Sequence, residues 1–377
     1  MAATPVRFGI IGCGLMGCEF ASAAARWFHL NGGIPAPVVV AVCDVNQQNL
    51  DWFRSVPGVQ YFYNDYRELL ACGEVEAVYC SLPHNLHAQV YADTLDTGKH
   101  LLGEKPFGID EQANGLILDA VRRNPGAFVR CTSEFPYFPA AQQLVRWHAE
   151  GRFGRIIEAR FSIRHSSDMD LSKPINWKRR VETNGEYGCM GDLGIHTQHI
   201  PFRLGFVPRS VYAMPTKLVA QRPDGHGGMA PCDTFDNAVL LCRTVDGQGS
   251  EFPVVYEMKR MAPGCTNCVQ YEIYGMDMSA VFTTDDPNAI RYTVQNGREQ
   301  AWARLVIGQK TAFPVITGSI FEFGFSDSLL QMMAAFTSEL RGLPVPFGCF
   351  TPEETALSHR LLTAALLSHR ENRVVEL

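Results

Sequence analysis

Val6-Arg-Phe-Gly-Ile-Ile11 runs directly into Gly12-Cys-Gly14-Leu-Met-Gly17, and this stretch decides the fold. The apolar run predicts a strand, and the glycine spacing is that of the strand-to-helix turn in dinucleotide-binding sheets. Gly12 permits the tight turn, Gly14 lets the backbone approach a pyrophosphate, and Gly17 lets the helix pack closely on the strand. The stretch therefore predicts a nucleotide-binding sheet in this part of the chain.

Further apolar runs follow the first strand and alternate with helical patterns. The runs lie at residues 38–43, 77–82 and 100–102, and the helical patterns lie at residues 15–30, 46–55, 65–72, 86–97 and 110–123. Continuous runs of this kind suit parallel strands that are covered on both faces. The alternation predicts an α/β domain with a doubly wound parallel sheet, which we place at residues 1–128.

The pattern changes after about residue 130. Longer, amphipathic strand patterns lie at residues 156–164, 210–220, 237–244, 251–258 and 269–275, and helical patterns lie at residues 327–341 and 352–369. Such strands predict a mostly antiparallel sheet with one face open to solvent or to a partner. We therefore expect an α+β domain at residues 129–377, whose C-terminal helix can pack back on the first domain.

Composition excludes several classes of protein. The 377 residues include 33 Lys and Arg against 39 Asp and Glu, and no basic run is dense enough for nucleic-acid binding. The first residues lack the pattern of a signal peptide, and no stretch of about 20 apolar residues could span a membrane. We expect a cytoplasmic protein with reduced cysteines and without nucleic-acid or membrane partners. Cys265 and Cys268 form a CxxC pair, but no second pair at zinc-site spacing is evident.

An acidic residue at the end of the second strand indicates which cofactor binds. Asp44 can accept hydrogen bonds from both ribose hydroxyls and would repel a 2′-phosphate, and no arginine follows it. The helix N-terminus at Leu15 and Met16 would face the pyrophosphate. These residues predict NAD rather than NADP, although the segment 31–37 lengthens the interval before Asp44. The alternative is that Asp44 is an ordinary turn residue.

The third strand is followed by a loop with the sequence Ser-Leu-Pro-His-Asn-Leu-His. Loops at the carboxyl ends of parallel strands line the ligand crevice of such sheets. We therefore expect cofactor contacts from Ser81, Pro83, His84, Asn85 and His87. Both histidines are equally well explained as ordinary loop and helix-start residues.

Lys105, Asp192 and His196 are the candidate catalytic residues. Oxidation of an alcohol needs a base for the hydroxyl proton and a group that stabilises the developing alkoxide. Asp192 and His196 are one helical turn apart, so a carboxylate could orient the imidazole as the base. Lys105 follows Glu104 where the sheet would end, and Pro106 holds it in extended geometry and permits a cis peptide bond. Each residue alone has an ordinary structural explanation as an ion pair, a helix cap or a packed side chain.

Together these motifs resemble the glucose–fructose oxidoreductase / inositol dehydrogenase family (Gfo/Idh/MocA). The resemblance covers nearly the whole chain. Its motifs are the glycine fingerprint at 12–17, the loop at 81–87, Gly103 to Pro106, Glu134 to Tyr137, Gly191 to His196, and the helix that begins at Thr351. It implies a Rossmann domain followed by an open, mostly antiparallel sheet, the outer face of which joins subunits into a homodimer or homotetramer.

The resemblance also implies a catalytic role for Lys105 and His196, with Asp192 positioning substrate hydroxyls. Glu104 and Lys105 would also contact the cofactor. The polar segment before the catalytic helix, with Arg164 and Trp177, suits a sugar ring, and we add Tyr137 to the candidate substrate contacts. The activity so implied is the reversible oxidation by NAD of a secondary hydroxyl to a ketone. The substrate would be a sugar, a glycoside (including position C3 of a glucoside) or a cyclitol.

Three alternatives stay open at this point. The first is inositol oxidation by the same chemistry, and the second is a regulator that binds NAD without catalysis. The third is a metal-dependent lyase or hydrolase that uses Asp192, His196 and His199, although no fourth ligand stands at a natural spacing. The sequence also leaves open the oxidised carbon, the release of NAD in each cycle, and the role of the Gly- and Pro-rich loop at 222–231. That loop would either cover the substrate or reach a neighbouring subunit.

Overall fold

The computed structural model describes residues 4–307, 310–318 and 321–377. The chain forms two compact units, of which the first holds residues 1–137 and 310–355 and the second holds residues 138–309 and 356–377. The first unit is therefore discontinuous in sequence. The division into residues 1–128 and 129–377 stays a prediction, but the unit that contains the N-terminal sheet also contains part of the C-terminal region.

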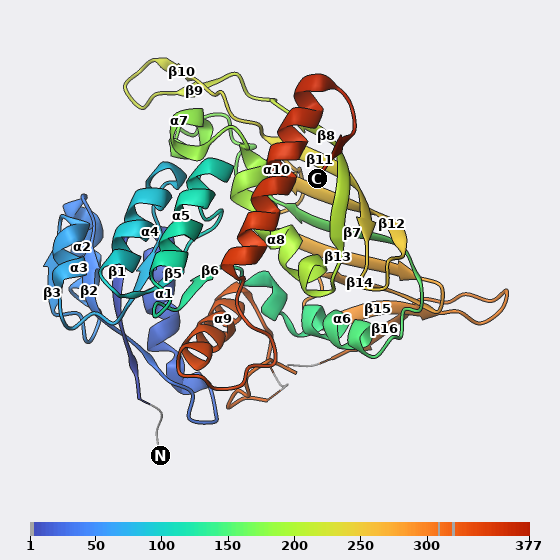
Figure 1. Ribbon diagram of the computed structural model, residues 1–377, viewed down its shortest axis with the longest axis horizontal. Helices are drawn as coiled ribbons and strands as arrows, with labels where there is room; N and C mark the ends of the chain where they lie inside the picture. Colours follow the sequence, from blue (N-terminus) through green and yellow to red (C-terminus); the bar gives the residue numbers. More distant parts are fainter. Residues whose placement is uncertain (1–3, 308–309, 319–320) are drawn as a thin grey trace. The chain divides into compact units, whose positions relative to one another are not determined.

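The first unit contains a parallel sheet of six strands in the order β3-β2-β1-β4-β5-β6 (Figure 1). The strands are β1 (Val6–Ile11), β2 (Pro37–Cys43), β3 (Tyr61–Tyr63), β4 (Ala77–Cys80), β5 (His100–Gly103) and β6 (Val129–Cys131). Neighbouring strands are parallel throughout. The expected doubly wound α/β sheet is confirmed, and β3 and β6 are additional strands that were too short to predict.

Helices cover this sheet. They are α1 (Leu15–Ala25), α2 (Gln47–Phe53), α3 (Tyr66–Ala71), α4 (His87–Asp96), α5 (Glu111–Arg123) and α9 (Phe325–Leu340). α4 packs on β5 and on α5, whereas α1 packs on β2 and on α9 (Figure 1). α1 is shorter than predicted because it ends at Ala25 and a 3-10 turn, η1 (Trp27–His29), follows. Beyond η1, Asn31 donates its backbone N–H to the carbonyl of Pro314 at 2.8 Å, so the long connection before β2 pairs with the chain near residue 314.

The second unit contains a mixed sheet of nine strands in the order β16-β15-β14-β13-β7-β12-β11-β8-β17 (Figure 1). The strands are β7 (Ile156–Arg164), β8 (Val207–Thr216), β11 (Asn237–Val245), β12 (Glu251–Lys259), β13 (Cys268–Gly275), β14 (Met278–Thr283), β15 (Ala289–Val294), β16 (Ala303–Val306) and β17 (Val375–Glu376). The pair β7–β12 is parallel, and the other pairs are antiparallel. The expected mostly antiparallel sheet is confirmed.

Alternate residues of these strands are buried and exposed, as the amphipathic pattern requires. β12 buries every second side chain, and on the exposed face of the sheet Met214 and Leu241 show 62% and 50% of their surface. The helices of this unit are α6 (Pro139–Ala149), α7 (Val181–Asn184) and α8 (Cys189–Arg203), and α10 (Pro352–Glu371) begins in the first unit and continues into the second. α8 packs on β7, β11 and β12, which explains why its residues from Cys189 to Pro201 are all buried.

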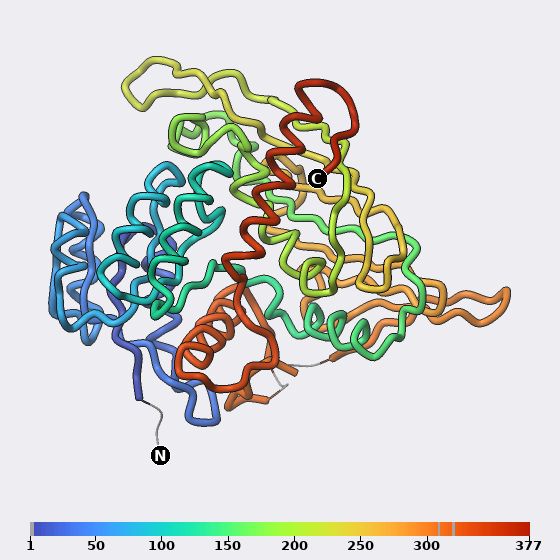
Figure 2. Tube along the Cα trace, viewed as in Figure 1, coloured from blue at the N-terminus to red at the C-terminus, as the bar shows by residue number. Residues whose placement is uncertain are grey.

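The segment 222–231, predicted as a loop, lies in a short hairpin. β9 (Gln221–Pro223) pairs with β10 (Met229–Pro231), and Figure 2 traces this hairpin beyond the edge of the nine-stranded sheet. The turn closes because Oδ1 of Asp224 accepts the backbone N–H groups of His226 and Gly228, at 2.7 and 2.9 Å. Among the described residues, no helix is both long enough and apolar enough to cross a membrane.

Candidate active site

The glycine turn after β1 has the shape that a pyrophosphate requires. Gly12 has a φ of +94°, and a Cβ there would lie 2.2 Å from the carbonyl oxygen of Ser81. A Cβ on Gly17 would lie 2.4 Å from the carbonyl oxygen of Gly12, so both glycines are needed for packing. Gly14 differs, because nothing lies within 4 Å of its Cβ position and no side chain caps α1. The backbone is open where an anion would approach the helix N-terminus.

Asp44 lies beside this turn. Its Oδ2 accepts hydrogen bonds from the backbone N–H of Cys13 at 2.8 Å and from the side-chain amide of Asn49 at 3.0 Å. Leu15 and Val45 expose 78% and 91% of their surface, although both are large and apolar. An oriented carboxylate with exposed apolar side chains beside it suits the ribose and base of a nucleotide. The residues present therefore fit NAD.

The loop after β4 is tied to the glycine turn. Ser81 donates its hydroxyl to the carbonyl oxygen of Gly12 at 2.7 Å. His87 is fully buried, and its Nδ1 accepts the backbone N–H of Gly108 at 3.4 Å. Its Nε2 therefore carries the hydrogen and donates to the carbonyl of Leu82 at 2.9 Å. These contacts give His87 a packing role that fixes the loop.

Of the other predicted cofactor contacts in this loop, His84 is buried, Pro83 is half-buried and Asn85 is exposed. Pro83 precedes the 3-10 turn η2 (His84–Leu86), which leads into α4.

Glu104, Lys105 and Pro106 follow the end of β5, and the Lys105–Pro106 peptide bond is cis. Glu104 is buried and accepts the hydroxyl of Tyr79 at 2.7 Å through Oε1. Its backbone N–H donates to the carbonyl of Cys80 at 2.9 Å, and its carbonyl accepts the hydroxyl of Tyr91 at 2.9 Å. Lys105 thus directly follows a residue, Glu104, that is hydrogen-bonded through both its backbone and its side chain.

A second buried carboxyl belongs to the same cluster. Glu134 follows β6 and exposes 5% of its surface. Burial and the negative charge of Glu104 raise the pKa of Glu134 to about 7, against the lowering effect of Lys105. Glu134 therefore titrates in the neutral range.

In the second unit, Asp192 lies in the first turn of α8 and His196 lies one turn later. Both side chains are buried. The ammonium of Lys178 donates to Oδ1 and Oδ2 of Asp192, at 3.1 and 3.2 Å, and Nη2 of Arg260 donates to Oδ2 at 3.2 Å. Two cations therefore pair with the buried Asp192 side chain. The hydroxyl of Tyr271 donates to the backbone carbonyl of His196 at 2.7 Å.

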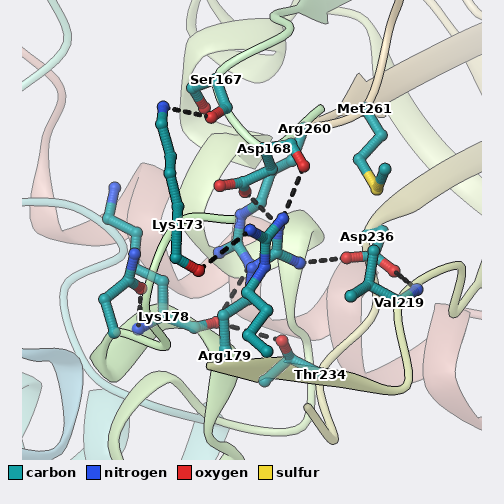
Figure 3. Close-up of polar contacts among 12 residues, drawn as sticks. Ser167, Asp168, Lys173, Lys178, Arg179, Val219, Thr234, Asp236, Arg260 and Met261 are labelled. Atoms are coloured by element: carbon teal, nitrogen blue, oxygen red, sulfur yellow. Dashed lines mark hydrogen bonds and ion pairs between the residues drawn. The ribbon is translucent and has the colours of Figure 1, made fainter. Parts of the chain in front are cut away.

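A network of buried cations fixes the segment before α8. Arg179 is fully buried and pairs with both Asp168 and Asp236, while Nη1 of Arg260 donates to the carbonyl of Lys178 at 3.0 Å (Figure 3). The backbone carbonyl of Lys178 also accepts the hydroxyl of Thr234 at 3.0 Å, so the backbone of Lys178 is held in place. This network positions the Lys178 side chain so that its ammonium contacts the Asp192 carboxylate on α8.

His165 belongs to the same charged environment. Burial lowers the pKa of His165 to about 4, and this effect outweighs the opposing attraction of Asp192. The imidazole is therefore neutral at neutral pH. Its Nδ1 lies 2.7 Å from the hydroxyl of Ser167.

The three predicted substrate contacts outside the catalytic set lie in different surroundings. Tyr137 is fully buried in the first unit, and its hydroxyl donates to the carbonyl of Phe347 at 3.3 Å. Arg164 ends β7 and donates to Oε1 of Gln270 at 2.8 Å. Trp177 is half-buried, and the ammonium of Lys178 lies 5.6 Å from the centre of its ring. Arg164 and Trp177 therefore share the second unit with Asp192 and His196, and all three roles stay predictions.

The candidate residues divide between the units. Lys105 and the residues predicted to bind the nucleotide belong to the first unit, whereas Asp192 and His196 belong to the second. In the part of the chain that the structure describes, no group of three or more His, Cys, Asp or Glu side chains could hold a metal ion. All twelve cysteines are free thiols, including Cys265 and Cys268.

Comparison with protein families decides the classification. Residues 6–127 match the model described as oxidoreductase family, NAD-binding Rossmann fold, and residues 141–298 match the GFO/IDH/MocA C-terminal domain. The chain belongs to the GFO/IDH/MocA family. Together the two matches cover most of the sequence. This member of the family is an NAD-dependent oxidoreductase that acts on CH–OH groups.

Individual relatives agree with this membership. Levoglucosan dehydrogenase of Pseudarthrobacter phenanthrenivorans is 24% identical over 74% of this chain and 73% of its own length. Glucose-6-phosphate 3-dehydrogenase of Bacillus subtilis is 26% identical over 58% of this chain and 60% of its own length. A solved structure of a levoglucosan dehydrogenase in complex with NADH superimposes with a TM-score of 0.88 at 20% identity, and covers 99% of both chains.

Three residues of this family member were not identified as site residues from its sequence: Lys178, Arg260 and Glu134. Arg260 directly follows β12, and Glu134 stood only within a motif. Because β12 runs parallel to β7, with Lys259 opposite Arg164, Arg260 lies at the same end of the sheet as Arg164. The position of Arg260 near Arg164 follows from the strand pairing, which the sequence alone does not show.

Proposed function

We propose that this protein oxidises a secondary hydroxyl of a sugar, glycoside or cyclitol to the ketone, in a reversible reaction with NAD. The observation that carries the proposal is the buried Asp192 carboxylate, held by Lys178 and Arg260 one helical turn before His196. A carboxylate fixed by two cations can accept hydrogen bonds from substrate hydroxyls without losing its position. The names of the dehydrogenases similar to this chain support a carbohydrate substrate, and position C3 of a glucoside is the specific expectation.

Three side chains would divide the work. His196 removes the hydroxyl proton, Lys105 stabilises the alkoxide that develops, and Asp192 orients the neighbouring hydroxyls. NAD, when bound, accepts the hydride. Glu104 helps to place Lys105, because its own side chain and backbone are fixed by Tyr79, Cys80 and Tyr91.

The test is a panel of sugars, glycosides and inositols with NAD, followed by the absorbance of reduced nicotinamide. Lys105→Met and His196→Asn should each lower kcat by at least about 100-fold, which is the contribution typical of one positioned acid–base group. NAD affinity, measured by calorimetry, should stay nearly unchanged in both variants. Full activity in either variant would refute the assignment.

Inositol oxidation and NAD binding without catalysis are the competing outcomes. Turnover confined to the inositols would support the first. NAD binding without reduction by any polyol of the panel would support the second.

A further inference from the structure

Two buried carboxyls end neighbouring strands of the parallel sheet. Glu104 follows β5 and Glu134 follows β6, and they expose 6% and 5% of their surfaces. The pairing extends one residue past the end of β6, because the backbone N–H of Thr132 donates to the carbonyl of Gly103, the last residue of β5, at 3.0 Å. Lys105 directly follows Glu104 and acts electrostatically on Glu134. Two acidic side chains and a lysine therefore share one buried edge of the sheet.

The two carboxyls have different roles in this cluster. Glu104 accepts the hydroxyl of Tyr79 at 2.7 Å. Two neighbouring buried carboxyls resist ionising together, because burial removes their solvation and their negative charges repel each other. Burial and Glu104 accordingly raise the pKa of Glu134 to about 7. Glu134 is therefore the member of the pair whose pKa is raised.

Two further titratable groups that interact with Glu134 do not titrate in this range. Burial raises the pKa of Tyr79 and of Cys131 well above their usual ranges, so both stay neutral. α9 packs on the turn η3 (Phe135–Tyr137) that follows Glu134: the ring of Phe325 contacts that of Phe135, and the sulfur of Met332 accepts the backbone N–H of Ser133 at 3.2 Å. Of the charged side chains, Glu104 raises the pKa of Glu134 and Lys105 lowers it.

We propose that Glu134 is a positioning residue. While Glu134 holds its proton, the Glu104–Lys105 pair is electrically neutral, and the Lys105 ammonium can stabilise a developing alkoxide. The proposal rests on the function proposed above for Lys105. With Glu134 protonated, one carboxylate balances one ammonium. With Glu134 ionised, the cluster carries a net negative charge next to a group that must stabilise another negative charge. Oxidation should therefore slow as Glu134 loses its proton.

The first measurement is the pH dependence of kcat for the full-length protein with NAD and the best polyol of the panel. In the wild-type protein kcat should decline as the pH rises, with a midpoint near pH 7, the pKa expected for Glu134. Glu134→Gln is permanently neutral and nearly isosteric, so it should lack this decline and should exceed the wild type several-fold at pH 8.5. Glu339→Gln is the matched control: it removes a largely buried carboxyl that is paired with Arg130 at 2.9 Å, and it should keep the wild-type profile. A Glu134→Gln profile identical to that of the wild type would overturn the proposal.

The second measurement needs neither cofactor nor turnover. Infrared difference spectra of the cofactor-free protein should show the carbonyl stretch of a protonated carboxyl that disappears between pH 6 and pH 8, and Glu134→Gln should lack this band. Absence of any such band in the wild type would overturn the proposal, even where the variant fails to fold. If the band is present but Lys105→Met is fully active, Glu134 holds a proton and the catalytic function proposed for Lys105 is wrong.

Discussion

The ammonium of Lys178 donates to both carboxylate oxygens of Asp192, and the guanidinium of Arg260 donates to the same carboxylate. The two cations differ in exposure: the Lys178 side chain is 40% exposed, whereas that of Arg260 is 1% exposed. Lys178 can therefore be removed without burying an uncompensated charge, while Arg260 cannot. Because of this difference, substitutions of Lys178 and of Arg260 can test the role of Asp192 in substrate binding separately from its contribution to stability.

Lys178→Met should raise KM for the polyol by about 10-fold, because a carboxylate that loses one charge-assisted partner is held less firmly for substrate hydroxyls. Its free energy of unfolding should change by less than about 1 kcal/mol, as for other partly exposed ion pairs. Steady-state kinetics and urea unfolding measure the two effects. Lys217→Met, at an exposed lysine of the same unit, should change neither quantity. An unchanged KM in Lys178→Met would argue against Asp192 as a substrate-binding residue.

Arg260→Met should destabilise the protein by about 3–5 kcal/mol, since it leaves Asp192 and Asn184 without a buried cationic donor. Urea unfolding of this variant should therefore occur at clearly lower denaturant concentration than that of Lys178→Met. Equal stabilities of the two variants would contradict the assignment of Arg260 as the structural partner of Asp192.

Gly14→Ala tests nucleotide binding separately from folding. The position has a φ of −75°, and nothing lies within 4 Å of the added Cβ, so thermal stability should be unchanged. The methyl group would nevertheless stand where a pyrophosphate approaches the backbone, and NAD affinity should fall by 10-fold or more. Gly12→Ala is the contrast, because its Cβ would clash with the carbonyl of Ser81 and the variant should lose stability. A Gly14→Ala protein with normal NAD affinity would place the cofactor elsewhere.

Asp44→Ser should weaken the preference for NAD over NADP. The carboxylate is oriented by the backbone N–H groups of Cys13 and Asn46, both at 2.8 Å, and would repel a 2′-phosphate in this position. We expect at least a 10-fold loss in kcat/KM with NAD and a smaller loss, or a gain, with NADP. Asp119→Ser, on the exposed face of α5, is the control. An unchanged cofactor ratio in Asp44→Ser would show that another residue selects the cofactor.

How much the sequence predicts depends on how local each feature is. The glycine turn and the segment Glu104 to Pro106 are continuous stretches, so their residue types report directly on backbone geometry. Asp192 and His196 were paired correctly as neighbours on one helix. The cations that hold Asp192 lie 14 and 68 residues away along the chain, and only the folded sheet brings them together. The expected roles of Asp192, orienting His196 and positioning substrate hydroxyls, did not include these partners.

The missed strands have a similar explanation. β3 and β6 contain three residues each, too few to show a period. The sequence of the β9–β10 hairpin predicts a loop because its glycines dominate the local signal. Its fixed position comes from Arg222, which is buried and donates to the carbonyls of Asp168 and Asp170 at 2.5 and 2.7 Å. A buried arginine that binds distant backbone carbonyls leaves no pattern in the sequence.

The proton on Glu134 also predicts how stability depends on pH. The folded state raises the pKa of this carboxyl from 4.5 to about 7, so between these values the folded protein binds more proton than the unfolded chain. The stabilising contribution of this group is then fully present below about pH 4.5 and is lost as the pH rises through 7. Unfolding free energies of the wild type and of Glu134→Gln, measured by urea titration from pH 4.5 to 8, should diverge in favour of the variant, with a slope of at most about 1.4 kcal/mol per pH unit. Parallel curves over this interval would mean that Glu134 does not retain its proton in the folded state.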